Sequence, residues 1–279
     1  MIFPLHDENP TRRTPFFTFA IIGVNAVVFL GSLQLSVPDR TVLWYARGFV
    51  PARIAQLADP KPVVVDLPVQ APQPLRPGVV EVRRLEFQPV RGQILLSLLT
   101  CMFLHGGWLH LVGNMWFLWV FGNNVEDRLG HVAFLVFYLL GGLVASACHW
   151  MTGPLSTTPV IGASGAVATM LGAYAITWPW ARVKSLVFLF VIVTVVDLPA
   201  LLVLGVWFLL QLISATNADL EMGGGVAWWA HVGGFLTGML LMPFVSALLS
   251  ATDESAGPDQ LNLFGFGRDD DIRRPDDYS

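Results

Sequence analysis

Long apolar runs separated by short polar connections dominate this sequence. A helix needs about 20 apolar residues to cross roughly 30 Å of hydrocarbon. Six stretches have about that length, so the pattern predicts a bundle of six transmembrane helices. They are residues 16–35, 108–125, 132–151, 164–180, 198–214 and 228–249.

The apolar run 186–213 decides the count, because Asp197-Leu198-Pro199 interrupts it. Two crossings would need about 40 residues, and the run is much shorter. We therefore predict one crossing, 198–214, with 186–196 as a lead-in or interfacial piece. Asp197 is expected at the membrane interface, since a carboxylate at membrane depth is costly. Six crossings place both termini on the same side.

Composition changes mark three further segments. Residues 1–15 are expected to form a cytoplasmic N-terminal segment. Within a membrane domain spanning 16–250, the stretch 41–57 has helix-like spacing suited to a membrane surface. The Pro- and Val-rich stretch 59–90 is expected to be an extended external loop insertion. The tail, 251–279, is rich in Asp, Arg, Gly and Pro, and we expect it to be disordered and cytoplasmic.

The overall composition supports the membrane interpretation. Hydrophobic residues make up 54% of the chain and charged residues only 13%, with a mean hydropathy of +0.61; a soluble chain carries about 25% charged residues. The sequence thus predicts an all-α polytopic membrane protein in a lipid bilayer. A net charge of −4 argues against nucleic acid as a partner.

The short basic connections set the orientation. Arg12-Arg13, Arg128 and Arg182 with Lys184 all fall on the side of the termini, which the positive-inside rule makes cytoplasmic. The first external loop also carries Lys and Arg, but it is long, and long loops translocate largely regardless of charge.

Candidate chemistry lies where three of the apolar segments begin. Ser164, in Gly162-Ala163-Ser164-Gly165, starts the fourth crossing, and His231 starts the sixth. Both of these crossings run from the outer face inward, as does the second, which begins with His110 and Asn114. The count of crossings therefore predicts that these four side chains lie at similar depth near the outer leaflet.

Each group then has a possible role. Histidine is the usual base that activates a serine hydroxyl, so His231 is a candidate base for a Ser164 nucleophile. His110 and Asn114 are four residues apart, share one helix face, and could bind an oxyanion together with the Ser164 N–H. Gly162 and Gly165 leave room for a substrate backbone.

Simpler explanations exist for every one of these residues. Ser164 alone is more often a helix N-cap, and a histidine where a crossing begins is more often a packing residue. Gly234-x-x-x-Gly238 is most simply a helix-packing face, which would bring the sixth crossing close to the fourth. The joint arrangement of four polar groups on one side favours a site.

These motifs resemble the rhomboid intramembrane serine proteases over residues 16–250. The matching pieces are His105-x4-His110-x3-Asn114, Glu126-x-Arg128, Gly162-Ala163-Ser164-Gly165 and Ala230-His231-x2-Gly234-x3-Gly238.

The resemblance implies a Ser164/His231 dyad without a third acid and an oxyanion site at His110, Asn114 and the Ser164 N–H. It also implies lateral entry of a membrane-protein substrate between the second and fifth crossings. Cleavage is then expected near the outer face, at small residues in weakly helical segments, without cofactor or metal. A bacterial inner membrane is the expected location.

The sequence also departs from the family pattern, and Thr169 and the 59–90 insertion are among the departures. Leu96-Ser97 stand where many members have Trp-Arg. Ala168 stands where many members have an aromatic residue that packs on the histidine, which leaves open what orients His231. The rival interpretation is a non-catalytic rhomboid-like protein that binds or escorts client membrane proteins.

Overall fold

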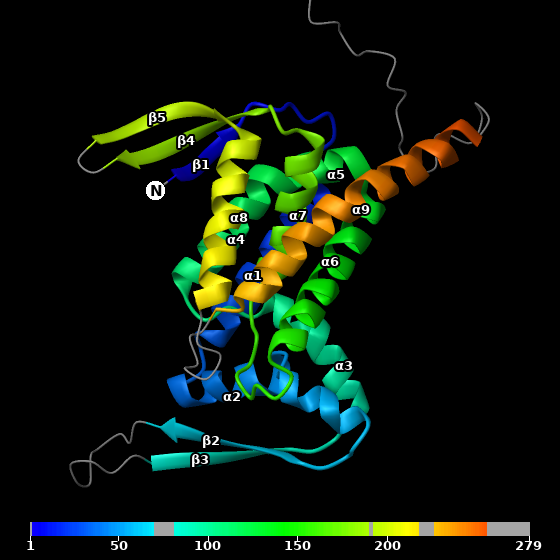
Figure 1. Ribbon diagram of the computed structural model, residues 1–279. Helices are drawn as coiled ribbons and strands as arrows, with labels where there is room; N and C mark the ends of the chain where they lie inside the picture. The colour runs from blue at the N-terminus through cyan, green and yellow to red at the C-terminus, as the bar shows by residue number, and fades with distance from the viewer. Residues whose placement is uncertain (1, 70–80, 190–191, 218–225, 256–279) are drawn as a thin grey trace, which may run out of the picture.

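The computed structural model describes residues 2–69, 81–189, 192–217 and 226–255. Most of them are helical, and the helices form a bundle with a small β-structure at each end (Figure 1). The helices are α1 (Phe16–Ser32), α2 (Val37–Arg47), η1 (Pro51–Leu57), α3 (Arg91–Thr100), η2 (Cys101–Phe103), α4 (Trp108–Phe117), η3 (Leu118–Gly122), α5 (Asn123–Leu129), α6 (His131–Thr152), α7 (Ser164–Thr177), α8 (Ala200–Asn217) and α9 (Trp228–Ser255). The strands are β1 (Ile2–Asp7), β2 (Val63–Val69), β3 (Glu81–Phe87), β4 (Arg182–Leu189) and β5 (Ile192–Pro199).

Three helices of the described chain are long and apolar enough to cross a membrane: α6, α8 and the 228–249 part of α9. The segments 91–103 and 108–129 pass the same test as a pair that is bent by 82°, which would make a fourth crossing. Two more helices, α1 and α7, are apolar but have only 17 and 14 residues.

The central helix is α7, and every residue from Gly165 to Ala175 on it is buried. A helix that is apolar all round is stable only when other elements enclose it. On one side α9 approaches it at backbone distance, because a Cβ placed on Gly234 or Gly238 would collide with the carbonyl of Gly165 or Thr169. This is the close approach expected from the Gly234-x-x-x-Gly238 spacing.

The described part of 186–196 forms β-strands, so the expected lead-in or interfacial piece is a β-structure and the chain is not all-α. Strands β4 and β5 form an antiparallel hairpin, and β1 adds to it in the order β1-β4-β5. The run from Leu186 to Val196 is rich in β-branched and aromatic residues, which suit a strand, and Asp197 faces Lys184 across the hairpin. Because the hairpin remains outside the bundle, 186–217 contributes one long helix, α8, as the count of crossings requires.

The N-terminal segment is part of the fold rather than a free tail. Strand β1 pairs with β4, and the Trp116 indole N–H donates to the carbonyl of Pro4 at 2.7 Å. Local sequence alone could not reveal this, because β1 and β4 are more than 170 residues apart in the chain.

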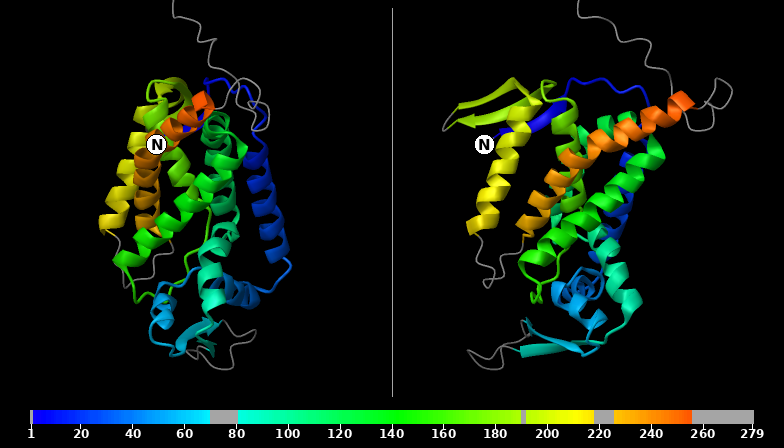
Figure 2. Two further views of the ribbon diagram at one scale, coloured as in Figure 1. Left: turned by 90° about the vertical axis from the view of Figure 1, so that its right-hand side faces the viewer. Right: turned by 45° about the vertical axis from the view of Figure 1, so that its right-hand side comes forward.

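At the other end of the bundle lie α2, η1 and a second hairpin (Figures 1 and 2). Strands β2 and β3 pair in register from Val63 with Phe87 to Val69 with Glu81. The expected extended insertion, 59–90, is therefore a β-hairpin in its described part, and residues 70–80 lie outside the described chain. Most of the expected disordered tail, 256–279, also lies outside it, while 251–255 continue α9.

Candidate active site

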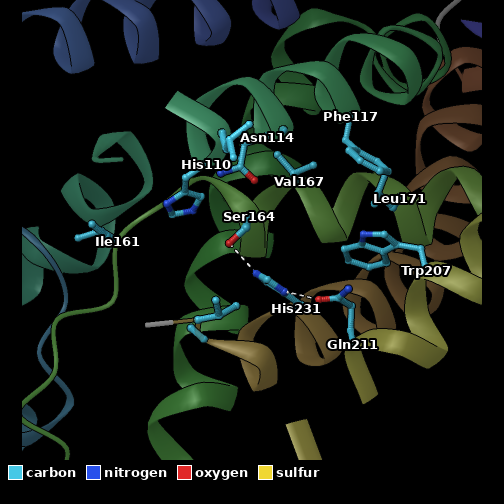
Figure 3. A pocket seen from close by; sticks show the side chains of 14 residues that line it. His110, Asn114, Phe117, Ile161, Ser164, Val167, Leu171, Trp207, Gln211 and His231 are labelled. Atoms are coloured by element: carbon cyan, nitrogen blue, oxygen red, sulfur yellow. Dashed lines mark hydrogen bonds between the residues drawn. The ribbon is translucent and has the colours of Figure 1, made fainter. Parts of the chain in front are cut away.

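Ser164 and His231 are in direct contact. The Ser164 hydroxyl lies 2.7 Å from His231 Nε2, although the two residues are 67 positions apart (Figure 3). Both line a pocket of about 480 Å³ between α4, α7, α8 and α9. The remaining lining residues are Leu109, His110, Gly113, Asn114, Phe117, Ile161, Val167, Leu171, Trp207, Gln211, Val226 and Ala227.

Helix geometry explains why the two side chains meet. Ser164 is the first residue of α7, and His231 lies in the first turn of α9. The two helices begin at the same end of the bundle and pack through glycines, so their first turns are adjacent. The amide N–H groups in the first turn of α7 have no acceptor within the helix, and they provide positive potential beside the serine oxygen.

His110 and Asn114, predicted to share a face, both line this pocket from α4 (Figure 3). The Gly106 N–H donates to His110 Nδ1 at 3.4 Å, which assigns the ring proton of a neutral His110 to Nε2. Asn114 Nδ2 lies 3.1 Å from His105 Nε2. If one N–H of the Asn114 amide donates to His105, the second N–H can donate to a group in the pocket.

Gly162 has a conformation and a position that a larger residue would not tolerate. Its φ is +121°, and a Cβ there would lie 2.5 Å from His110 Nε2. Its N–H donates to the carbonyl of Cys101 at 2.9 Å. Gly162 therefore keeps the loop before Ser164 against His110, beside the pocket. Gly165, in contrast, faces Ala145 of α6, so its role in this structure is packing.

The residue next to His231 that sequence reasoning missed is Gln211. Its Oε1 lies 2.8 Å from His231 Nδ1 (Figure 3). Trp207, one turn earlier on α8, lies 6.1 Å from the imidazole at an interplanar angle of 33°, and Trp228 approaches it edge-on at 5.8 Å. These three side chains surround the imidazole of His231. Residue 168, at which many family members have an aromatic side chain for this purpose, is Ala. The sequence did contain a sign of this residue, because Gln211 is the one amide side chain within the apolar run 200–213.

Metal-ligating residues do not cluster in the described part of the chain: it contains no group of three or more His, Cys, Asp or Glu that could hold an ion. The chemistry of the pocket is that of a hydroxyl, two imidazoles and two amides.

Glu126, from the Glu126-x-Arg128 motif, lies away from the pocket. Its carboxylate accepts hydrogen bonds from the Phe17 and Thr18 N–H groups at 2.8 and 2.7 Å, and from the Thr18 hydroxyl at 2.7 Å. Asp127 accepts from the N–H groups of Arg12 and Arg13. The Glu126 carboxylate therefore satisfies N–H groups at the start of α1, where free N–H groups and the helix dipole favour negative charge. The Asp127 carboxylate binds the segment that precedes α1.

Comparison with known families agrees with this arrangement. The model of the Rhomboid domain matches residues 92–248, which is more than half of the chain and contains every pocket residue. The chain belongs to the rhomboid family.

Individual relatives align with about half of the chain. RHOMBOID-like protein 4 of Arabidopsis thaliana is 34% identical over 156 residues, which cover 54% of this chain and 34% of the relative. Rhomboid-like protein 11, chloroplastic, of the same plant is 28% identical over 55% of this chain and 53% of its own length. Presenilin-associated rhomboid-like protein A, mitochondrial, of Danio rerio is 30% identical over 52% and 36%.

The chain thus spans about half the length of these curated relatives, or less. Family membership and the apolar helices support a membrane protein. By their names, one of these relatives is chloroplastic and one is mitochondrial, so they give no support to the expected bacterial inner membrane.

Proposed function

We propose that this rhomboid is an intramembrane serine endopeptidase that cleaves transmembrane segments of other membrane proteins. The observation that carries the proposal is the 2.7 Å contact between the Ser164 hydroxyl and His231 Nε2 in a pocket at the start of α7. A serine is a poor nucleophile unless a base takes its proton, and here the base is within hydrogen-bonding distance.

The reaction follows from this pair. Ser164 Oγ attacks the carbonyl carbon of the scissile peptide while its proton passes to His231 Nε2. The tetrahedral intermediate collapses, His231 protonates the leaving amine, and an acyl-enzyme remains on Ser164. Water then attacks the ester with His231 as base, and the proton returns to Ser164 when the acid product leaves.

His110 and Asn114 stabilise the negative charge on the carbonyl oxygen. The Gly106 contact leaves the His110 proton on Nε2, and Asn114 supplies an amide N–H. The backbone N–H of Ser164 at the start of α7 completes the oxyanion site.

Substrates enter the pocket from the lipid between α4 and α8, the second and fifth of the proposed crossings. Phe117 of α4 and Trp207 of α8 both line the pocket, and their rings contact each other with centroids 6.3 Å apart, so these side chains must separate when a substrate enters. The bond that is cut must reach Ser164 in an extended form, which favours small residues and weakly helical substrate segments.

The proposed topology has six crossings, with α1 and α7 added to the four long segments. At 1.5 Å per residue α1 is about 26 Å long, close to the hydrocarbon thickness. The shorter α7 is enclosed by protein, so it need not match the lipid. The termini and the β1-β4-β5 sheet are then cytoplasmic, and the pocket lies near the outer face, in a cell membrane of bacterial type.

Cleavage of a model transmembrane substrate in liposomes tests this function. Ser164→Ala and His231→Ala should each abolish cleavage, while their melting temperatures remain close to that of the wild type. A fluorophosphonate should label the wild type at Ser164 and leave Ser164→Ala unlabelled. Cleavage retained by either variant would exclude the dyad mechanism.

The second candidate is a rhomboid-like protein that binds or escorts client membrane proteins without cutting them. Its supporting observation is the same pocket, which could hold a short segment of a client protein whether or not Ser164 reacts. It predicts client binding by the wild type with neither fluorophosphonate labelling nor product.

A further inference from the structure

We infer that Gln211 is a positioning residue that fixes the protonation and orientation of His231. This inference rests on the proposed function, and it adds a third side chain to a site that the sequence presents as a dyad. The observation behind it is the 2.8 Å contact between Gln211 Oε1 and His231 Nδ1.

The chemistry requires one particular tautomer. A neutral imidazole carries one proton, and only the nitrogen without it can accept the proton of Ser164. An acceptor placed against Nδ1 holds the proton there and leaves Nε2, which is 2.7 Å from Ser164 Oγ, unprotonated. The amide oxygen of Gln211 is such an acceptor, and it also stabilises the imidazolium that forms when Nε2 takes the serine proton.

The surroundings hold Gln211 and the ring in this arrangement. Gln211 and Trp207 are four residues apart on α8, so they present one face to α9. Trp207 and Trp228 contact the imidazole from two directions, and His231 itself is only 8% exposed. Rotation of the ring would break the bond to Gln211.

Two substitutions at position 211 distinguish the effect of the amide oxygen on catalysis from the effect of the shape of the side chain. Gln211→Met keeps the length but removes the acceptor, and we expect kcat to fall roughly 10- to 100-fold with little change in KM, a part of the 10²–10⁴ that a positioned base supplies. Gln211→Glu keeps an acceptor at Nδ1, so it should retain most of the activity. Its charge stabilises the imidazolium, so the acidic limb of its pH–rate profile should move to higher pH.

The matched control is Leu210→Met, which introduces the same residue one position earlier, on the exposed side of α8. Cleavage kinetics, fluorophosphonate labelling rates and melting temperatures should be measured for all four proteins. Labelling should slow in Gln211→Met to the same extent as cleavage, because it needs the same base. The control should match the wild type in every measurement.

The tautomer can be read without activity, from ¹⁵N spectra of histidine-labelled protein with His231→Ala for assignment. The wild type should show Nδ1 protonated and Nε2 bare, and Gln211→Met a mixture. Equal kcat in wild type and Gln211→Met, or an equal loss in Gln211→Glu and Gln211→Met, would overturn the positioning role while the dyad stands. A wild type that neither labels nor cleaves would instead refute the proposed function, and this inference with it.

Discussion

Buried polar groups gather at both ends of this bundle, but they differ in what they face. At the start of α7, Ser164, His231 and Asn114 point into a pocket of about 480 Å³. At the opposite end, Glu126 and Asp7 are 0% and 2% exposed, and their carboxylates receive hydrogen bonds from the protein itself. Polar atoms that face a cavity can act on a ligand, whereas polar atoms bonded to the fold hold it together.

The second cluster ties the N-terminal segment to the helices of the site. Asp7 Oδ2 accepts from the Asn124 amide at 2.6 Å and from the Tyr174 hydroxyl at 2.8 Å. Tyr174 is on α7, the helix that begins with Ser164, and Trp116, which binds the Pro4 carbonyl, is on α4 with His110. The comparison therefore predicts loss of activity without unfolding at one end, and loss of stability at the other.

The largest effect is expected from the Ser164 and His231 pair. Ser164→Ala, His231→Ala and the double variant should each lower kcat about 10⁴-fold or more, with no further loss in the double variant, because the two residues act as one unit. Single-turnover cleavage assays measure this. Losses that multiply in the double variant would show that the residues act independently.

Next comes Glu126→Ala, which removes the acceptor of three N–H and O–H groups at the start of α1. Leaving buried donors unpaired should lower the free energy of unfolding by about 3–5 kcal/mol. Asp127→Ala is the matched control, with a smaller loss, since its partners are more exposed. Denaturant titration in micelles measures both. An unchanged free energy of unfolding in Glu126→Ala would contradict the assignment of a stabilising role to the polar groups at the end of the bundle opposite the pocket.

His110→Ala and Asn114→Ala should each reduce kcat about 10²–10³-fold, the cost of one oxyanion donor, while KM and the melting temperature change little. Val112→Ala serves as the control, because Val112 is an exposed residue of the same helix outside the pocket. An increase in KM alone would assign these two residues to substrate binding rather than to the transition state.

The smallest effect concerns Asp7 and pH. Burial raises the pKa of the Asp7 carboxyl above its ordinary value, against the opposing effect of the Tyr174 hydrogen bond. The folded state therefore favours the protonated Asp7 carboxyl. The stability that protonated Asp7 contributes is complete below the pKa of Asp7 in the unfolded chain, and it is lost as the pH rises through the pKa of Asp7 in the folded protein.

Asp7→Asn replaces the carboxyl with an amide that does not titrate. The free energy of unfolding of this variant should therefore fall less than that of the wild type between acidic and neutral pH. Thermal unfolding across this range tests it, with Glu8→Gln as the control on the exposed neighbour. A wild-type slope that persists in Asp7→Asn would place the titrating group elsewhere.

The sequence by itself determined the apolar helices and the four residues that meet at the pocket. Apolar length and the polar interruptions are local properties of the chain, and the alternation of crossings is enough to place Ser164, His231, His110 and Asn114 at one end. The same reasoning required one helix between 186 and 217, and α8 supplies it.

Only the tertiary structure decided what supports those residues. Gln211 meets His231 because α8 packs beside α9, and Ala168 gives no hint of this contact. The β1-β4-β5 sheet joins segments at distant places in the chain, and an apolar run such as 186–196 is compatible with a helix or a strand until its partner strand is known. Contacts between distant segments depend on packing, which no local pattern of residues records.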